Sequence, residues 1–325
     1  MPPWSQLADE ILAGRRLMAD EGLAALRAPD AELLELLAAA YRLRRQFFGN
    51  QVQLNLLINA KSGQCGEDCG YCSQSRVATA AIARYPLLEA DQLLDGARLA
   101  AERRARTYCI VTSGRRASDR ELAAICDAAR AVKSQFALRV CVSPGFLDDA
   151  QAAQLAAAGV DRVNHNLNTS ARFYPRICTT HTHQERLDTL RAVRTAGMEI
   201  CSGGIIGLGE DDEDVVALAL QLGELRAEAV PLNFLQPIAG TPLADAGPLT
   251  PRYCLKALCL FRLANPACEL RIAAGREMHL RSLQPLGLFA ANSIFVGDYL
   301  TTQGQPPEED YRMLADLGFE PVVGG

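Results

Sequence analysis

The sequence predicts a (β/α)8 barrel of the TIM type, with a helical extension at the N-terminus. Three observations support this fold class. After residue 50, short strand-like runs recur about eight times, and amphipathic stretches separate most of them. The chain has 325 residues, which is enough for one such barrel. Hydrophobic residues make up 49% of the chain, as expected for a globular protein with a substantial core.

The first segment, residues 1–50, is predicted to be helical. Leu7 and Ile11 share one helical face, and leucines recur at three- and four-residue spacing from Asp30 to Phe48. The Pro29-Asp30 pair is a typical start of the second helix. We expect this segment to cover a larger domain and to carry no chemistry.

The second segment, residues 51–302, is predicted to form the barrel, and residues 303–325, with Pro306-Pro307, a C-terminal tail. Active groups of such a barrel lie at the C-terminal ends of the strands. The expected helices between the strands include Asp119–Ser134, Asp148–Ala158, Gln184–Ala196 and Asp212–Leu225. The expected strands are Gln51–Ala60, Thr107–Gly114, Ala137–Gly145, Val160–Asn168, Met198–Gly207, Ala229–Ile238, Glu269–Gly275 and Ser293–Leu300.

Charge and hydropathy exclude several classes of function. The net charge of −5 argues against nucleic-acid binding, which usually needs a basic excess. No apolar run approaches the ~20 residues that cross a bilayer. The N-terminal residues Met1–Ser5 lack the basic start and apolar stretch of a signal peptide, so a cytoplasmic location is expected. The 11 cysteines are an odd number, which argues against a disulfide framework and favours metal binding for the clustered ones.

Three cysteines lie in one loop after the first strand, Asn59–Cys72, which we call the cysteine loop. Cys65, Cys69 and Cys72 could surround one iron–sulfur cubane and leave one iron open to a non-protein ligand. A zinc knuckle and chance clustering are the alternatives. Structural zinc normally takes four protein ligands, and His165, His181 and His183 are distant in sequence.

Three further cysteines fall inside predicted strands. Cys109, Cys141 and Cys201 lie at similar heights on the second, third and fifth strands, and Arg271 lies comparably on the seventh. Each thiol taken alone reads as a small buried hydrophobe. If all four side chains point inward they meet on the barrel axis, where they could hold a second iron–sulfur centre, and both readings stay open. The remaining cysteines are expected to be structural: Cys126, Cys178, Cys254, Cys259 and Cys268.

A row of amides lies within the predicted fourth strand, Val160–Asn168. Asn164, Asn166 and Asn168 should share one face because side chains alternate across a strand, and His165 should then point outward and be packed. Buried amides need hydrogen-bond partners, which ligand hydroxyl or ureido groups would supply. A structural network or ordered water is the alternative. Asn233 on the sixth strand is a further amide near the mouth.

The spacing Cys-x3-Cys-x2-Cys, with Tyr71 before the last cysteine, resembles the signature of the radical S-adenosylmethionine (SAM) superfamily. This resemblance implies that the open iron of a [4Fe–4S] cluster binds SAM, which is cleaved to a 5′-deoxyadenosyl radical, and that Tyr71 packs at the adenine. Other segments, from about Gln51 to Asp298, resemble the biotin synthase family. They are Tyr108-Cys109, Cys141, Asn164-His165-Asn166-Leu167, Thr179-Thr180-His181-Thr182, Cys201-Ser202-Gly203-Gly204, Gly240-Thr241-Pro242-Leu243, Gly275-Arg276-Glu277 and Ala291-Asn292-Ser293-Ile294.

The resemblance to the biotin synthase family implies a homodimeric radical SAM sulfurtransferase that inserts sulfur between C6 and C9 of dethiobiotin. It assigns the [4Fe–4S] cluster to the cysteine loop, and SAM to Tyr71, Asn166 and Asn168. Asn164 and Asn233 would contact dethiobiotin. A [2Fe–2S] cluster, the proposed sulfur donor, would be held by Cys109, Cys141, Cys201 and Arg271.

The cofactors carry the radical chemistry, so the resemblance implies no catalytic side chain. It implies an electron-transfer protein of the flavodoxin or ferredoxin type as partner. Two positions depart from the family: Asn168 stands where some members have aspartate, and Val163 stands where tyrosine is frequent. Two alternative functions are another radical SAM reaction and a zinc-bound scaffold. The strand cysteines and Arg271 discriminate sulfur insertion from the other radical SAM reactions, because sulfur insertion needs a sulfur source.

Overall fold

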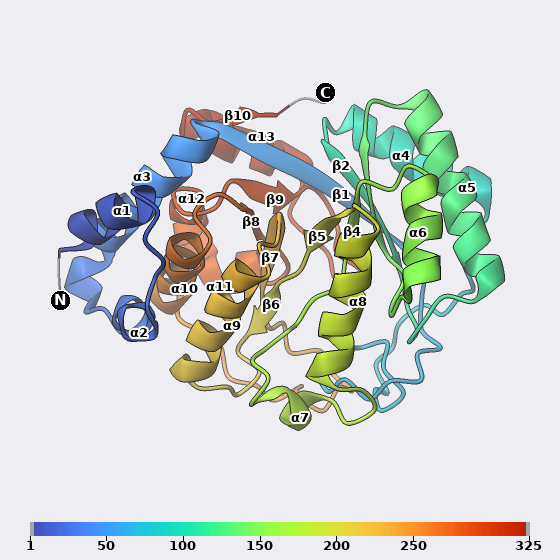
Figure 1. Cartoon of the computed structure of the whole chain (residues 1–325), viewed down its shortest axis with the longest axis horizontal. Helices are drawn as coiled ribbons and strands as arrows, with labels where there is room; N and C mark the ends of the chain where they lie inside the picture. Colours follow the sequence, from blue (N-terminus) through green and yellow to red (C-terminus); the bar gives the residue numbers. More distant parts are fainter. Residues whose placement is uncertain (1–2, 323–325) are drawn as a thin grey trace.

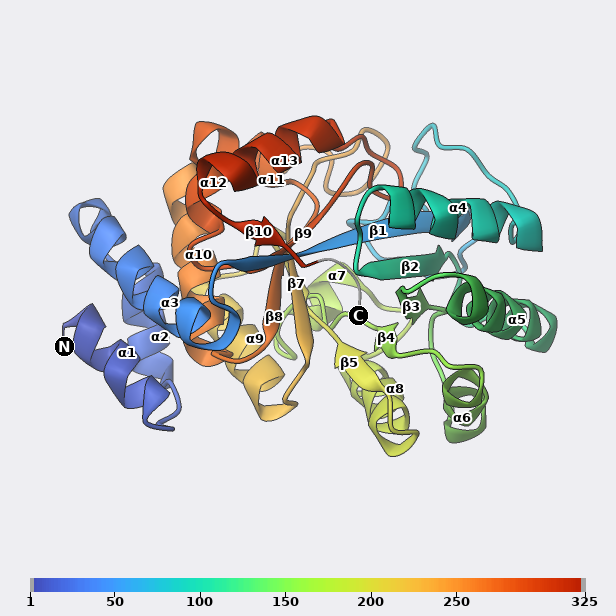
Figure 2. The same ribbon diagram turned by 90° about the horizontal axis from the view of Figure 1, so that it is seen from above.

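The computed structural model describes residues 3–322, and these form a closed parallel barrel surrounded by helices (Figures 1 and 2). The barrel closes where β1 pairs with both β2 and β9. The predicted fold class is therefore confirmed. In chain order the barrel strands are β1 Gln51–Lys61, β2 Thr107–Thr112, β3 Arg139–Ser143, β4 Arg162–Asn164, β5 Glu199–Cys201, β6 Gly204–Ile206, β7 Ala229–Phe234, β8 Glu269–Ile272 and β9 Ser293–Phe295.

The fifth barrel position is split into β5 and β6, although the sequence predicts one strand there. Both pieces pair with β7, at Cys201 with Ala229 and at Gly204 with Leu232. Pro231 lies opposite the gap and has no N–H to donate to a strand ladder. Gly203 fills the gap, because a Cβ there would lie 1.8 Å from the Pro231 carbonyl oxygen. The break therefore follows from one proline and one glycine in neighbouring strands.

Helices cover the outside of the barrel, as Figure 2 shows for α4, α5, α6 and α8. Helices α5, α6, α8 and α9 each begin with a capping box, in which the side chains of Ser118, Asp148, Thr182 and Asp211 accept a hydrogen bond from a backbone N–H one turn on. The helices are α4 Ala90–Glu102, α5 Asp119–Gln135, α6 Asp149–Ala157, α7 Tyr174–Ile177, α8 His183–Thr195, α9 Asp212–Glu224, α10 Pro251–Ala264, α11 Arg276–Leu280 and α12 Gln284–Gly287, with a 3-10 turn at Arg281–Leu283.

The N-terminal segment is helical, as the leucine spacing predicts. It consists of α1 Trp4–Leu12, α2 Ala19–Leu26, a 3-10 turn at Asp30–Glu32, and α3 Leu33–Phe48. Helices α2 and α3 contact α10, so the extension covers one side of the barrel (Figure 1). Within residues 3–322, no helix has both the length and the apolar character needed to cross a membrane.

The C-terminal stretch, expected to be a tail, is part of the fold. Helix α13, Pro307–Asp316, is followed by the short strand β10, Glu320–Pro321, which pairs in parallel with the start of β1. Asp310 on α13 is fully buried and receives two hydrogen-bonding contacts from Arg276, at 2.8 and 3.0 Å. The buried Arg276 thus fixes helix α13 in place. The two prolines at the start of α13 do not indicate this contact.

We predict that Asp310→Ala lowers the free energy of unfolding by about 3 kcal/mol, because it leaves the Arg276 guanidinium buried without its carboxylate. The midpoint of urea unfolding measures the loss. Asp316→Ala, at an exposed position of the same helix, is the control and should change little. Equal midpoints for the two variants would show that α13 is not anchored through Asp310.

Candidate functional site

A cavity of about 390 Å³ opens at the C-terminal ends of the barrel strands. It lies where catalytic groups of such barrels are found. The cysteine loop contributes to its wall, and so do residues at the ends of β2, β3, β4 and β7. All predicted site residues line this one cavity except Cys201, which is fully buried next to it.

The thiols of the cysteine loop lie in the cavity wall beyond the C-terminal end of β1, and we call Cys65, Cys69 and Cys72 the upper group. Cys65 and Cys72 are half-buried and Cys69 is buried. The loop is held at both ends, since the Gly63 N–H donates to Gln74 Oε1 at 2.9 Å and the Gly70 N–H donates to the Ile177 carbonyl at 2.9 Å. Three soft thiols in one short loop, beside an open cavity, match the donor set of a cubane with one iron left for a ligand.

Two acidic residues inside the loop fasten it to the segment after α7. Asp68 accepts hydrogen bonds from the backbone N–H groups of Thr179, at 2.9 Å, and Thr180, at 3.2 Å. Burial opposes ionisation of Asp68, but these hydrogen bonds and that of the Thr179 hydroxyl outweigh it and hold its pKa below the usual range. Glu67 pairs with His181 and with Arg115. This docking is not apparent from the sequence, although Glu67-Asp68 and Thr179-Thr180-His181 belong to two of the motifs named above.

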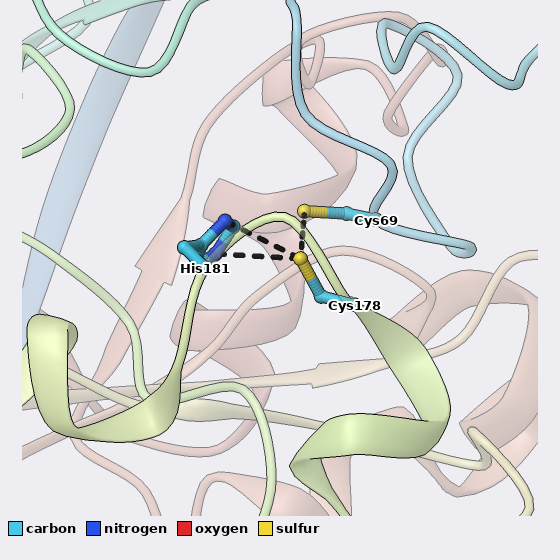
Figure 3. A group of neighbouring side chains, drawn as sticks. All are labelled: Cys69, Cys178 and His181. Atoms are coloured by element: carbon cyan, nitrogen blue, oxygen red, sulfur yellow. Dashed lines mark hydrogen bonds between the residues drawn. The ribbon is translucent and has the colours of Figure 1, made fainter.

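Cys178, expected to be an isolated structural thiol, lies against the cysteine loop. Its sulfur is 3.8 Å from Cys69 Sγ and 3.3 Å from His181 Nδ1 (Figure 3). The hydrogen bond from Cys69 outweighs burial and, with the contacts to His181 and Thr180, lowers the pKa of Cys178 to about 4. The same Cys69–Cys178 hydrogen bond, together with burial, raises the pKa of Cys69. The expectation failed because spacing along the chain does not report a contact between segments about 110 residues apart.

The strand cysteines Cys109, Cys141 and Cys201 form a second group of thiols deeper in the barrel. Cys109 and Cys141 lie opposite each other in the β2–β3 register. All three are buried and pack in one cluster with Phe295 and Tyr299. The neighbouring Cys109 thiol and burial raise the pKa of Cys141 well above the ordinary value. The three thiols therefore converge inside the barrel, which is the geometry that a second metal centre requires.

Arg271 lies in the same layer, fully buried, with its guanidinium 4.8 Å from the centre of the Phe295 ring. Its Nε donates to Ser293 Oγ at 3.2 Å, and its Nη2 donates to Asn55 Oδ1 at 2.9 Å and to Glu269 at 2.5 Å. Within residues 3–322, no hydrogen bond is made by Nη1. One nitrogen of a fixed guanidinium is thus left for the cavity.

A buried carboxylate balances the charge below the thiols. Glu269 receives Arg271 on one oxygen and Arg162, at 2.6 Å, on the other. Burial by itself would raise the pKa of Glu269, but Arg271 and Arg162 outweigh it and hold the pKa well below the usual range. Glu269 and Arg162 cannot be recognised from the sequence, since single charged residues at the starts of strands form no pattern.

The three asparagines line the cavity, but not by strand alternation. β4 ends at Asn164, and Asn168 has a φ of 70°, in the left-handed region, so the expected long strand does not form. Asn164 Nδ2 instead donates to Asn166 Oδ1 at 3.0 Å, and Asn168 Nδ2 donates to the Tyr71 hydroxyl at 2.7 Å. The expectation that His165 points outward is wrong, because His165 also lines the cavity.

His165 packs against Phe146, with the ring centroids 4.9 Å apart. Asn233 is held by the barrel backbone on both sides of its amide. Its Nδ2 donates to the Gly204 carbonyl at 3.1 Å and its Oδ1 accepts from the Ala274 N–H at 3.1 Å.

Arg186, absent from the predicted site, places a positive charge at the cavity wall. Its Nη1 donates to the Asn166 carbonyl at 2.9 Å, and its Nη2 lies 3.0 Å from His181 Nε2. An arginine has only donors, so His181 Nε2 must accept and Nδ1 must carry the ring proton. That proton points to Glu67, which lies in short contact with Nδ1. Arg186, His181 and Glu67 therefore form one connected chain of hydrogen bonds from the cavity to the cysteine loop.

Comparison with known proteins agrees with this arrangement. Residues 61–222 match the Radical SAM superfamily, and residues 231–320 match the Biotin and Thiamin Synthesis associated domain. The chain is 53% identical over 321 residues to the biotin synthase of Rhodopirellula baltica, covering 98% of this chain and 89% of the relative. It is 54% identical to the biotin synthase of Geobacillus thermodenitrificans and 49% identical to that of Bacillus subtilis, each over 98% of this chain and 96% of the relative. The chain belongs to the biotin synthase family.

Members of this family are radical SAM enzymes, and solved structures of more distant proteins share the fold. Methylornithine synthase superposes with a TM-score of 0.83 at 19% identity, covering 97% of each chain. The FeFe-hydrogenase maturase HydG from Carboxydothermus hydrogenoformans superposes with a TM-score of 0.82 at 18% identity, covering 98% of this chain and 79% of that one. At such identities the similarity establishes the barrel alone.

We predict that Glu269→Gln destabilises the protein by about 3 to 5 kcal/mol, because a neutral amide leaves Arg271 buried without a carboxylate partner and leaves Arg162 with Glu199 alone. Urea unfolding at neutral pH measures the difference. Glu224→Gln is the matched control, at an exposed helix position. A loss no greater than that of the control would contradict the assigned charge balance.

The same pair predicts a pH dependence with a definite sign. A carboxyl with a depressed folded-state pKa contributes its full stability above its unfolded pKa of about 4.3, and loses it as pH falls through the lower folded-state value. The stability gap between the wild type and Glu269→Gln should therefore stay constant from about pH 7 to about pH 5. A gap that closes within that range would mean that Glu269 is not held ionised by Arg271 and Arg162.

Proposed function

We propose that the protein forms biotin by inserting sulfur between C6 and C9 of dethiobiotin, as a radical SAM sulfurtransferase. The observation that carries this proposal is the presence of two groups of three thiols, one above the other, beside a single cavity. Membership of the biotin synthase family supports it. Cleavage of SAM by itself would need only the three thiols of the cysteine loop.

Cys65, Cys69 and Cys72 would hold a [4Fe–4S] cluster, and the cavity beside them would hold SAM. When bound, the cluster supplies the electron that cleaves SAM to a 5′-deoxyadenosyl radical. Tyr71, fixed by the hydrogen bond from Asn168, offers an aromatic face toward the adenine. Asn168 keeps its side-chain oxygen Oδ1 for a ribose hydroxyl, since its Nδ2 is the atom that donates to Tyr71. An amide can therefore serve where some family members have an aspartate.

Polar groups next to Asn168 suit the amino-acid part of SAM. Asn166 lines the same wall, and the guanidinium of Arg186, bonded to its carbonyl, can pair with a carboxylate. Both are fixed by the protein before any ligand arrives, which lowers the entropy lost on binding.

Cys109, Cys141, Cys201 and Arg271 would hold a [2Fe–2S] cluster, which supplies the sulfur. Glu269, Asn55 and Ser293 fix the guanidinium of Arg271 through its Nε and Nη2, and its Nη1 makes no hydrogen bond within residues 3–322. Phe295 and Tyr299 pack against this layer and exclude water from it. Such shielding suits a carbon radical, which must be kept from solvent until the new bond forms.

Dethiobiotin would lie between the two clusters, with Asn164 and Asn233 as its polar contacts. Asn164 ends β4 beside Cys201, since its Nδ2 is 3.3 Å from the Cys201 sulfur. Asn233 is held rigidly by β6 and by the turn after β8. No side chain is assigned a catalytic role. The residues position the ligands, and the clusters and SAM carry the chemistry.

The proposal extends to partners and to organisation. The barrel, residues 51–302, is the proposed catalytic unit, with the helices of residues 1–50 outside it. The upper cluster requires a one-electron donor, for which a flavodoxin- or ferredoxin-type protein is proposed, and a homodimer is proposed from the family resemblance.

We predict that Cys72→Ser abolishes formation of 5′-deoxyadenosine from SAM in anaerobically reconstituted protein, because the upper cluster loses one of its three thiolates. Chromatographic assay of 5′-deoxyadenosine measures the effect. Cys126→Ser, a buried cysteine of α5 away from the cavity, should retain cleavage and serves as the control. Normal cleavage by Cys72→Ser would remove the assignment of the cysteine loop.

We also predict that Cys141→Ala still cleaves SAM but forms no biotin. The reconstituted wild type should contain about six iron atoms per chain, four plus two, and the variant about four. Iron and sulfide analysis with a dethiobiotin-to-biotin assay measures both. Wild-type iron content and biotin yield in Cys141→Ala would contradict the lower cluster, and would favour another radical SAM reaction.

A further inference from the structure

A stretch of chain without acidic residues covers the outside of the cysteine loop. From Cys69 to Leu88 the sequence contains Arg76 and Arg84 but no aspartate or glutamate. The stretch follows β1 and lies at the end of the barrel where α7 is found (Figure 1). The chain as a whole has a net charge of −5, so this stretch differs from it in sign. Its exposed residues are Arg76, Val77, Thr79, Ala81, Ala83, Arg84 and Pro86.

Arg76 and Arg84 both lie against the cysteine loop. The Arg76 N–H donates to the Glu67 carbonyl at 2.9 Å, and the Arg76 side chain is 56% exposed. Its guanidinium is 3.9 Å from the Asp68 carboxylate, which is too long for a hydrogen bond. The Arg84 side chain packs over Gly63, because a Cβ at Gly63 would lie 2.7 Å from Arg84 Cγ. Arg84 is exposed and, within residues 3–322, forms no ion pair.

A third exposed arginine lies where the loop meets α7. Arg176 is in the last turn of α7, next to Ile177, whose carbonyl accepts the Gly70 N–H at 2.9 Å. The Arg176 guanidinium also has no ion-pair partner in the part of the chain that the structure describes. We call these residues the arginine face: Arg76, Arg84, Arg176 and Val77, which is 44% exposed.

The carboxylates of the loop and of the segments that it contacts are engaged within the protein. Glu67 pairs with His181, and Glu185 pairs with Arg115 at 2.6 Å. Asp68 accepts backbone hydrogen bonds from the segment after α7. These carboxylates therefore do not neutralise the arginine face, whose positive charges are open to an outside partner.

The arginine face borders the part of the loop that is nearest to solvent. Gln64 and Gly66, the neighbours of the half-buried Cys65, are both exposed. The residues that flank this segment are Gly63, which Arg84 covers, and Glu67, which Arg76 contacts. A protein docked on the face would therefore touch the backbone that carries Cys65. Val77 offers it an apolar contact within a polar rim, as is usual in protein interfaces.

We propose that the arginine face docks an acidic one-electron carrier protein, which reduces the metal centre of the cysteine loop. The carrier loses one electron and the proposed [4Fe–4S] cluster gains it, so no further reactant is needed. Electrostatic steering raises association rates by about 10- to 1000-fold, and the net negative charge of the chain directs an acidic carrier to this face rather than elsewhere. The proposal rests on the proposed function, which requires such a donor.

The test uses the anaerobically reconstituted full chain, with flavodoxin hydroquinone as the probe. At low salt and subsaturating flavodoxin, we expect Arg76→Glu/Arg84→Glu to lower the rate of flavodoxin-driven SAM cleavage at least about tenfold. The difference should close at about 1 M salt, where the screening length is about 3 Å. Calorimetric titration of the chain with oxidised flavodoxin should show a matching loss of affinity at low salt.

Arg16→Glu/Arg45→Glu is the matched control, because it makes the same change of net charge at exposed positions of the N-terminal segment, away from the loop (Figure 1). It should leave the flavodoxin affinity and the rate unchanged. Arg76→Lys/Arg84→Lys keeps the positive charges and should keep most of the wild-type rate. Thermal unfolding establishes that each variant is folded. Wild-type flavodoxin affinity in Arg76→Glu/Arg84→Glu, or an equal loss in the control, would overturn the proposal.

A small neutral donor separates this result from the proposed function. Photoreduced 5-deazariboflavin needs no docking surface, so it should drive SAM cleavage equally in the wild type and in both charge-reversal variants. Slower cleavage by Arg76→Glu/Arg84→Glu with this donor would overturn the proposal, because the substitutions would then act on the loop itself. A chain that binds flavodoxin through the arginine face but cleaves no SAM with either donor would overturn the proposed function and leave the docking surface standing.

Discussion

The ion pairs between Glu269 and two arginines are the constraint on which the interior of this barrel depends. Arg162 and Arg271 are both buried, and Glu269 pairs with both of them, while Glu199 also pairs with Arg162. Unpaired, either guanidinium would carry a large desolvation cost. Paired, Arg271 becomes a rigid part of the cavity wall, level with three thiols that would otherwise be ordinary core residues. These buried ion pairs thus allow a polar binding site to exist inside an apolar barrel.

A second charged contact organises the mouth of the cavity. Glu67 and Asp68 lie between the loop cysteines in sequence, and they bind the Thr179–His181 segment through backbone and side-chain hydrogen bonds. The loop therefore presents its thiols on a frame set by a distant part of the chain. Arg186 joins this frame to the cavity wall, so the loop and the wall cannot move independently without breaking buried hydrogen bonds.

Local sequence predicted much of the architecture. Strand-like runs alternating with helical stretches predicted the barrel, and leucine spacing predicted the N-terminal helices. Both predictions succeeded because they depend on short-range sequence patterns. Two expectations failed where a long-range partner decides the outcome. The fifth strand splits because Pro231 lies opposite it, and helix α13 packs on the barrel because Asp310 meets Arg276. Neither partner is near in sequence, so no local pattern reports it.

The same division holds for the site. The sequence by itself determined which donor atoms the cysteine loop presents, since the spacing of Cys65, Cys69 and Cys72 within one loop limits the metal centres that they can bind. Only the tertiary structure decided which other groups join them. Cys178 lies against Cys69 although about 110 residues separate them, and Glu269 lies between its two arginines across the barrel. Loop spacing fixes distances along a short chain, whereas barrel closure fixes distances between strands that the sequence does not record.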